Sequence, residues 1–124
     1  MVQDNIISAR AYYQAMNDRD LPSMAKYLHS NVQVISPMGT ITGEKAVLDA
    51  AEGFMALFKT LRIRASFGLD DQVMLVYDFI DCPTPTAILR AAALMTFKDG
   101  LIIRNELFFD TQQFVKKPDF YDPK

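Results

Sequence analysis

The sequence predicts an α+β domain in which three N-terminal helices pack on a curved antiparallel sheet and close it into a cone. Apolar residues recur at steps of three and four as far as Phe58, and they alternate with polar residues from Leu61 onward. The 124 residues, half of them apolar, suffice for one hydrophobic core. We therefore expect one domain over residues 1–110 and an extended tail over residues 111–124, which contains two prolines and alternating charges.

The first two helices are predicted from apolar periodicity and from a capping residue. Residues from about Asp4 to Asn17 should form the first helix, because they carry one apolar stripe at helical spacing. The second helix should begin after Asp20, whose carboxylate can accept hydrogen bonds from unpaired backbone N–H groups, and Pro22 fits its first turn. The stripe of the first helix contains Val2, Ile6, Ala9, Tyr13 and Met16.

A short strand and a third helix are expected next. Residues 31–36 alternate between apolar and polar side chains, and Pro37 ends the strand that this pattern predicts. The third helix should open at Thr42 or Gly43. Its apolar stripe contains Val47, Ala51, Phe54 and Phe58.

The next two predicted strands each have one buried face. Residues 61–67 alternate, which is typical of a strand with one wet face, and residues 73–80 return after a turn. Asp78 would lie on the face opposite to the apolar side chains of its strand. The buried faces would hold Leu61, Ile63, Ala65 and Phe67 in one strand and Leu75, Tyr77 and Phe79 in the other.

The last two predicted strands, residues 87–97 and 101–109, are joined by Asp99 and Gly100, a strong signal for a tight hairpin. Both of their faces are apolar. One domain has only one interior, so we expect a second copy to cover the outer face and form a homodimer through the sheet. The two apolar sets are Ile88, Leu94, Ile102 and Phe108 against Ala91, Met95, Ile103 and Phe109.

Composition argues against several other classes of function. The net charge is −2 and the basic residues are scattered, so nucleic-acid binding is not expected. No apolar run is long enough to span a membrane, and the N-terminus does not resemble a signal peptide, which favours a cytoplasmic protein. Cys82 is the single cysteine, which excludes an internal disulfide and a cysteine-cluster metal site. We expect no cofactor and no metal.

One stretch carries a family resemblance. Residues 10–21, continued through Tyr27 and residues 32–39, resemble the opening of the nuclear transport factor 2-like superfamily. That superfamily includes ketosteroid isomerases, SnoaL-type polyketide cyclases and limonene epoxide hydrolases. The resemblance is to a SnoaL-like or ketosteroid-isomerase-like domain, and it implies a cone-shaped fold with a central pocket and a dimer.

The same resemblance bears on chemistry. It places Tyr12 at the oxyanion-hole tyrosine of the isomerases, but Ser36 at their base and Ala93 at their second donor acid. A serine without a basic partner cannot replace a carboxylate base, so steroid isomerisation is not expected. The histidine and aspartate pair of a cyclase is not found, and Arg90 supplies only the arginine of the hydrolase motif.

The leading functional prediction is a pocket for a small apolar molecule. Tyr12, Ser36 and Asn105 would give the pocket its polar groups. Each has a plainer interpretation: Tyr12 could pack with its hydroxyl at the surface, Ser36 could only end a strand, and Asn105 could make a structural hydrogen bond. The apolar lining would consist of Met16, Val34, Phe54, Phe58, Ile63, Tyr77, Met95 and Leu107.

Two alternatives remain open at this stage, and no catalytic residue is assigned. The chain could be an isomerase, cyclase or hydrolase that uses a noncanonical acid, with Asp78 or Asp81 as the first carboxylate to test. It could also be a dimeric protein-interaction module whose residues 114–124 dock on a partner. The identity of any ligand and the presence of any catalysis are not predicted.

Overall fold

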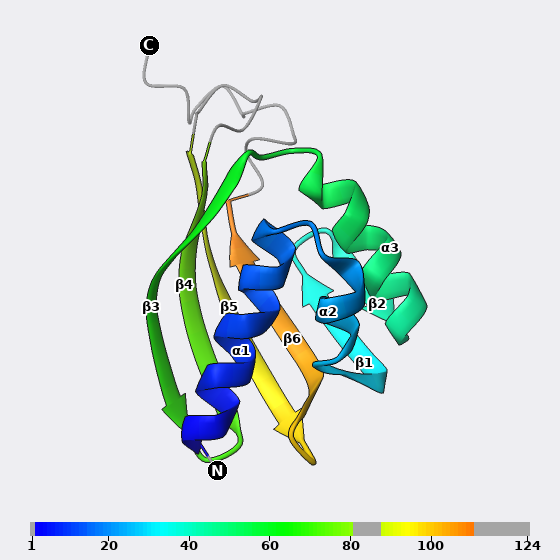
Figure 1. Cartoon of the computed structure of the whole chain (residues 1–124), viewed down its shortest axis with the longest axis vertical. Coiled ribbons are helices and arrows are strands. Elements are labelled where there is room, and N and C mark those ends of the chain that lie inside the picture. The colour runs from blue at the N-terminus through cyan, green and yellow to red at the C-terminus, as the bar shows by residue number, and fades with distance from the viewer. Residues whose placement is uncertain (1, 81–87, 111–124) are drawn as a thin grey trace.

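The computed structural model describes residues 2–80 and 88–110 and shows three helices on one face of a six-stranded sheet (Figure 1). The predicted α+β class is confirmed. Asp81, Cys82, the proline-containing loop and the tail after residue 110 lie outside the described residues. The helices are α1 (Val2–Asn17), α2 (Leu21–Ala25) and α3 (Glu44–Met55), and the strands are β1 (Leu28–Ser36), β2 (Gly39–Thr42), β3 (Thr60–Leu69), β4 (Gln72–Ile80), β5 (Ile88–Lys98) and β6 (Leu101–Phe109).

The sheet is mixed, with the order β2-β1-β6-β5-β4-β3. The predicted antiparallel sheet is confirmed except at one place, where β1 and β6 pair in parallel. All other neighbours are antiparallel. Helix α1 crosses the front of the sheet and packs on β3 and β4, while α3 lies beside β1 and β2 (Figure 1). The opposite face of the sheet carries no helix in the part of the chain that the structure describes.

Local signals explain most element boundaries. Asp20 caps α2 through its carboxylate, which accepts from Ser23 N at 3.2 Å. Asp99 and Gly100 both have positive φ, 53° and 80°, as a two-residue hairpin of this kind requires. Gly43 precedes α3 with φ 99°, a conformation that glycine adopts without strain.

Two predictions about elements are wrong. Residues 39–42 form β2, a strand that the sequence did not predict, because a four-residue edge strand carries little alternation. Helix α3 ends at Met55, so Phe58 lies beyond it and not on its stripe. Phe58 instead lies below the guanidinium group of Arg19, whose carbon is 4.6 Å from the ring centre. Arg19 also donates hydrogen bonds to the carbonyls of Met55, Phe58 and Lys59, which fixes the end of α3.

Bulges change which side chains face the core. In β3 the pairing shifts between Ile63 and Ala65, so the residues that follow exchange faces. Phe67, which the alternation predicted to be buried, is 63% exposed on the outer face. Gly68 takes the inner position, where an added Cβ would lie 2.5 Å from the side chain of Val2. A second shift lies between Thr96 and Phe97 of β5, opposite β6.

None of the helices in the described ranges is long and apolar enough to cross a membrane.

Candidate functional site

A cavity of about 330 Å³ lies between the inner face of the sheet and helices α1 and α3. This volume falls at the small end of the range for ligand pockets, about 300–1,000 Å³. Among the described residues, those that line the cavity include no charged side chain. The wall therefore offers mainly dispersion contacts, with a few hydroxyl and amide groups for direction.

The fold brings together eight of the eleven residues that the sequence predicted for a pocket. Helix α1 supplies two of them, and alternate residues of β1, β4 and β6 supply five more, because successive side chains of a strand face opposite sides. The register places Val34 of β1 directly beside Asn105 of β6. The eight residues are Tyr12, Met16, Val34, Ser36, Phe54, Tyr77, Asn105 and Leu107.

Three predicted residues do not line the cavity. Phe58 packs against Phe79, with ring centres 4.6 Å apart, behind the wall. Met95 is fully buried and pairs with Asn105 across β5 and β6. Ile63 is half-buried on β3, next to Tyr77. The register sets Met95 and Ile63 beside lining residues on the inner face but not against the cavity, a difference that alternation alone does not predict.

Sequence reasoning did not include several lining residues. Tyr13 was assigned to the core stripe of α1, yet it lines the cavity together with its neighbour Tyr12. The apolar stripe itself was the available signal, since Tyr13 is the polar member at its centre. The other additional residues are Met38, Ile41, Val47, Ala50, Ala51, Leu57, Phe79 and Phe109.

The polar centre of the cavity wall is a cluster of Tyr13, Tyr77 and Asn105, which we call the tyrosine–asparagine cluster. Asn105 Nδ2 donates to Tyr13 Oη at 3.0 Å, and Tyr77 Oη donates to the same oxygen at 3.4 Å. The rings of Tyr13 and Tyr77 pack with centres 4.7 Å apart. Asn105 Oδ1 is buried and has no hydrogen-bond partner in the described part of the chain. A buried acceptor without a partner costs about 1–3 kcal/mol.

Burial keeps the phenols of this region neutral. Burial raises the pKa of Tyr77 well above its ordinary value, and the nearby Tyr13 raises it further. Burial also raises the pKa of Tyr13, although hydrogen bonds from Tyr77 and Asn105 partly oppose the shift. The pKa of Tyr12 is raised by burial and by Tyr13. The tyrosines can therefore donate or accept hydrogen bonds, but they cannot act as bases near neutral pH.

The two remaining polar candidates are Tyr12 and Ser36. Tyr12 is 2% exposed, so the interpretation of a hydroxyl at the surface is wrong. Ser36 stands at the turn between β1 and β2, where its Oγ accepts from Met38 N at 3.1 Å and donates to Gly39 O at 3.3 Å. Ser36 therefore ends its strand, as the plainer interpretation held, while also forming part of the cavity edge.

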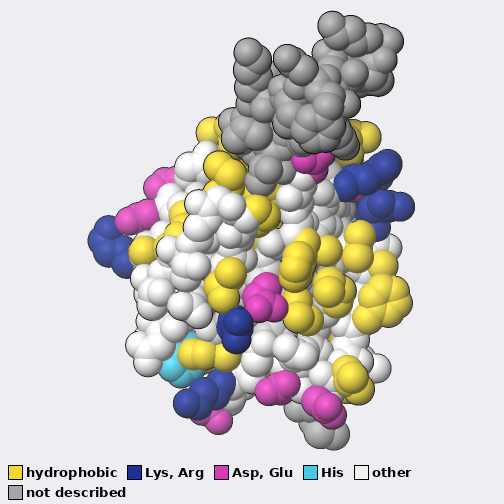
Figure 2. Space-filling model, turned by 180° about the vertical axis from the view of Figure 1, so that it is seen from behind, with side chains coloured by type: hydrophobic (Ala, Val, Ile, Leu, Met, Phe, Trp, Pro, Cys, Tyr) yellow, Lys and Arg dark blue, Asp and Glu magenta, His cyan; other side chains and the backbone are white. Residues whose placement is uncertain are grey.

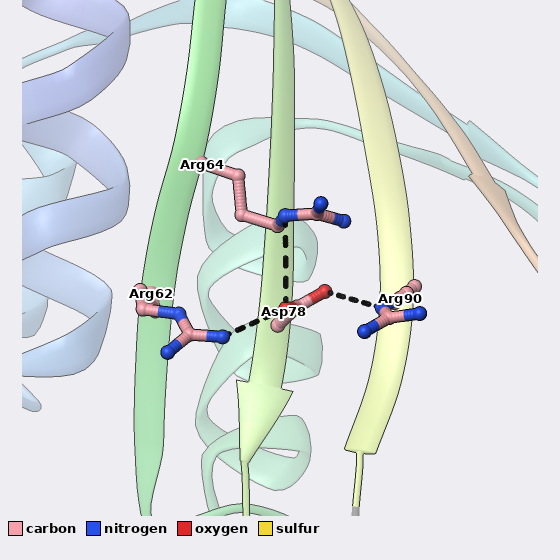
Figure 3. Close-up of polar contacts among 4 residues, drawn as sticks. All are labelled: Arg62, Arg64, Asp78 and Arg90. Carbon is pink, nitrogen blue, oxygen red and sulfur yellow. Dashed lines mark hydrogen bonds and ion pairs between the residues drawn. The ribbon is translucent and has the colours of Figure 1, made fainter.

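Asp78, the first acid proposed for catalysis, does not face the cavity (Figure 3). It lies on the outer face of β4, as alternation predicted, and its side chain is fully buried among three arginines. Asp78 Oδ2 lies 3.3 Å from Arg62 Nη2 and 4.0 Å from Arg64 Nε, and Oδ1 lies 3.5 Å from Arg90 Nε. The contact with Arg90 is an ion pair without hydrogen-bond geometry. Asp78 therefore cannot supply an acid or a base to the cavity.

The fold and the cavity together define a cone-shaped α+β domain that encloses a small apolar site. Residues 9–105 match the family of the SnoaL-like domain. The chain therefore belongs to the SnoaL-like family. No curated protein matches the chain.

Solved structures share the fold. A crystal structure of a protein from Kribbella flavida DSM 17836 has a TM-score of 0.81 and 26% identity, over 88% of both chains. A nuclear transport factor 2-like protein of unknown function from Cytophaga hutchinsonii ATCC 33406 has a TM-score of 0.74 and 21% identity, over 86% of this chain and 90% of that one. TerC, co-crystallised with polyporic acid, has a TM-score of 0.73 and 23% identity, over 90% of this chain and 95% of that one.

Proposed function

We propose that this SnoaL-like domain binds a small, mainly apolar molecule in the cavity and holds it by hydrogen bonds to the tyrosine–asparagine cluster. The observation that carries the proposal is an apolar cavity whose wall contains Asn105 with an unpaired amide oxygen. A few polar groups in an apolar wall are the usual design of a ligand site. The co-crystallisation of TerC with polyporic acid agrees with this role for the fold.

The cluster favours a particular kind of ligand. Asn105 Oδ1 is a hydrogen-bond acceptor without a donor among residues 2–80 and 88–110. A ligand hydroxyl or N–H group would offset the cost of this unpaired atom once a small side-chain movement opens a path to it. The hydroxyl proton of Tyr13 remains available, because its oxygen accepts from both Asn105 and Tyr77. A ring compound with one hydroxyl or carbonyl group fits both the small volume and this pairing.

The proposal is for binding and not for turnover. The cavity wall within the described ranges holds no carboxylate, imidazole or amine, and its phenols stay neutral. General acid–base catalysis needs a group that changes its protonation near the working pH. Steroid isomerisation and related proton transfers therefore lack a catalytic group in this wall.

A thermal-shift screen tests the proposal. Protein freed of copurified material would be heated with terpenoid alcohols and ketones, with naphthols, and with a steroid and a fatty acid as larger comparators. A ligand at 100 times its dissociation constant adds about 2.7 kcal/mol, which raises the melting temperature of a domain of this size by roughly 10 °C. Small ring compounds should give the largest shifts.

Two variants on neighbouring positions of β1 make the screen specific. Val34→Phe fills the cavity, because Val34 lines it. Ile35→Phe makes the same kind of change on the other face, where Ile35 pairs with Glu106 and not with Asn105. The ligand shift should disappear in Val34→Phe and persist in Ile35→Phe. Equal shifts in both variants, or no shift with any compound in the parent protein, would refute binding in this cavity.

A further inference from the structure

Asn105 stands on a fixed strand, but its side-chain amide is free to turn. Strand β6 pairs with β1 on one side and with β5 on the other, which sets Asn105 beside Val34 and Met95. These two ladders hold the backbone in place. The last torsion of an asparagine side chain is broad and roughly twofold, so a half-turn about it exchanges Oδ1 with Nδ2. The two atoms are similar in size, so the exchange needs no repacking of the neighbours.

The half-turn keeps the hydrogen bond between Asn105 and Tyr13. In one orientation, Asn105 Nδ2 donates to Tyr13 Oη at 3.0 Å. After the half-turn, Oδ1 occupies that position and accepts from the Tyr13 hydroxyl, which can donate as well as accept. Tyr77 Oη, 3.4 Å from Tyr13 Oη, donates to it in both orientations. Because Oδ1 has no partner in the described ranges, the half-turn breaks no second hydrogen bond.

The two orientations offer opposite groups to the cavity, which Asn105 lines. With Oδ1 turned away from Tyr13, the amide offers an acceptor and Tyr13 keeps a free hydroxyl proton. A ligand hydroxyl matches both groups, since it donates to Oδ1 and accepts from Tyr13. With Nδ2 turned away from Tyr13, the amide offers a donor, which matches a ligand carbonyl. In each complex, all the polar side-chain atoms of Asn105 and Tyr13 have a partner.

The surroundings of Asn105 require the polar group of the ligand to be neutral. The cavity wall contains no charged side chain among the described residues. Asp78 with its arginines, and Arg104 with Glu106, lie on the outer face of the sheet, where Figure 2 shows acidic and basic side chains. A carboxylate or an ammonium group in the cavity would be buried without a counter-ion, which is strongly unfavourable. Alcohols and ketones carry no such charge.

We propose that Asn105 is a turning amide, which lets the cavity bind a ring ketone and the alcohol of the same carbon skeleton with similar affinity. This inference rests on the proposed function, because it names the ligand class of the same cavity. The alcohol binds with Oδ1 toward it, and the ketone binds with Nδ2 toward it. The hydrogen bond between Asn105 and Tyr13 reverses its direction between the two complexes. An amide that did not turn would leave Oδ1 buried and unpaired beside the ketone, which is costly.

Three ligands with one ring skeleton test the turn in the unmodified full chain: α-tetralol, α-tetralone and tetralin. Nuclear Overhauser effects from the Asn105 Nδ2 protons show which group lies beside them. These protons should lie close to the Tyr13 ring in the α-tetralol complex. In the α-tetralone complex, they should lie close to the ligand. The dissociation constants of the alcohol and the ketone should agree within about tenfold, the scale of one neutral hydrogen bond.

Two variants separate a turning amide from a fixed one. Asn105→Leu removes both amide groups, whereas Tyr13→Phe removes the hydroxyl and leaves the amide. The affinity for α-tetralone should fall about tenfold in Asn105→Leu and much less in Tyr13→Phe, because Nδ2 is the donor to the ketone. Tetralin has no polar group, so it should bind Asn105→Leu at least as tightly as it binds the parent. Circular dichroism verifies that each variant is folded.

The results distinguish a failure of this inference from a failure of the proposed function. Nδ2 protons that stay beside Tyr13 in both complexes would show that the cavity binds but the amide does not turn. A greater loss of α-tetralone affinity in Tyr13→Phe than in Asn105→Leu would make Tyr13 the donor, and would also overturn the inference. So would binding of only the alcohol or only the ketone. If none of the three compounds binds the parent, the inference and the binding of small ring compounds in this cavity are both refuted.

Discussion

Tyr77 and Asp78 are neighbours on β4, yet they lie in opposite environments. Tyr77 faces the cavity and hydrogen-bonds to Tyr13, and its burial keeps it neutral. Asp78 faces the other side of the sheet and is surrounded by arginines. The polar contacts of the inner face are thus neutral hydrogen bonds, with Asn105 Oδ1 left unpaired among the described residues, whereas the outer face surrounds its buried charge with ion pairs. This difference supports the proposal that the inner site binds a neutral molecule, because the charged groups of this strand lie on the other face of the sheet.

Raising the pH should give the largest effect, because it ionises the buried tyrosines of the inner face. Burial raises the pKa of Tyr12, Tyr13 and Tyr77 above the ordinary value near 10, so the folded state favours their neutral forms. The stability that these neutral phenols contribute to the folded protein is complete below pH 10. It is lost as the pH rises toward the pKa values that the phenols have in the folded protein. Each phenol that stays neutral in the folded protein should lower the free energy of unfolding by up to about 1.4 kcal/mol between pH 9 and pH 11.

Urea denaturation at pH 7, 9 and 11 measures this effect. Tyr77→Phe should make the loss between pH 9 and pH 11 smaller, because one of the three buried phenols is gone. A free energy of unfolding that stays constant between pH 9 and 11 would contradict the account of the inner face.

The second test removes two of the arginine partners of the Asp78 carboxylate on the outer face. Arg62→Met/Arg90→Met leaves Asp78 with only Arg64, at 4.0 Å. A buried carboxylate stripped of its partners typically costs about 3 kcal/mol. Adding Asp78→Leu to the same variant should restore most of the stability, because no charge then remains buried. A double variant that loses under about 1 kcal/mol in urea would show that the carboxylate reaches water.

The third test removes Tyr13 Oη, the acceptor that two hydrogen bonds of the tyrosine–asparagine cluster share. Tyr13→Phe leaves both Asn105 Nδ2 and Tyr77 Oη without this acceptor, and should cost about 2 kcal/mol. Asn105→Leu in the parent should cost much less, since it also removes the unpaired Oδ1. Chemical denaturation of the two variants and their combination gives the coupling energy. If the losses in the two single variants simply add up in the combined variant, the hydrogen bond between Tyr13 and Asn105 contributes nothing to stability.

The test with the smallest expected effect compares two glycines. Gly68→Ala places a methyl group 2.5 Å from the side chain of Val2 on the inner face, and should cost about 1 kcal/mol as the start of α1 shifts. Gly53→Ala, in the middle of α3, meets open space and should gain about 1 kcal/mol through helix propensity. Melting temperatures of the two variants should therefore move in opposite directions. A higher melting temperature in both variants would mean that α1 does not pack tightly against β3 at Gly68.

The sequence predicted the elements whose signals are local. The hairpin at Asp99 and Gly100 and the alternation around Tyr77 depend on neighbouring residues alone, and the structure confirms both. The bulge of β3 could not be predicted, because the apolar alternation runs unbroken to Phe67 while the pairing with β4 shifts. The parallel pairing of β1 with β6 depends on contacts between distant segments, which periodicity does not report.

The candidate site was predictable in composition but not in arrangement. Tyr12 and Asn105 were identified as polar pocket candidates, and both line the cavity. The hydrogen bond between Tyr13 and Asn105 joins residues 92 positions apart, so no local sequence pattern predicts it. Phe58 and Met95 have the same chemistry as lining residues and differ only in position, since neither lies against the cavity. That difference is set by packing in three dimensions.

Nuclear magnetic resonance of side-chain N–H groups tests the central claim most directly. A small ring compound that shifts the melting temperature would be titrated into labelled protein, while the Asn105 amide and the arginine Nε–H signals are followed together. The account predicts saturable changes at Asn105, with Arg62, Arg64 and Arg90 unmoved. Changes confined to the three arginines, with Asn105 unaffected, would place binding on the outer face and contradict it.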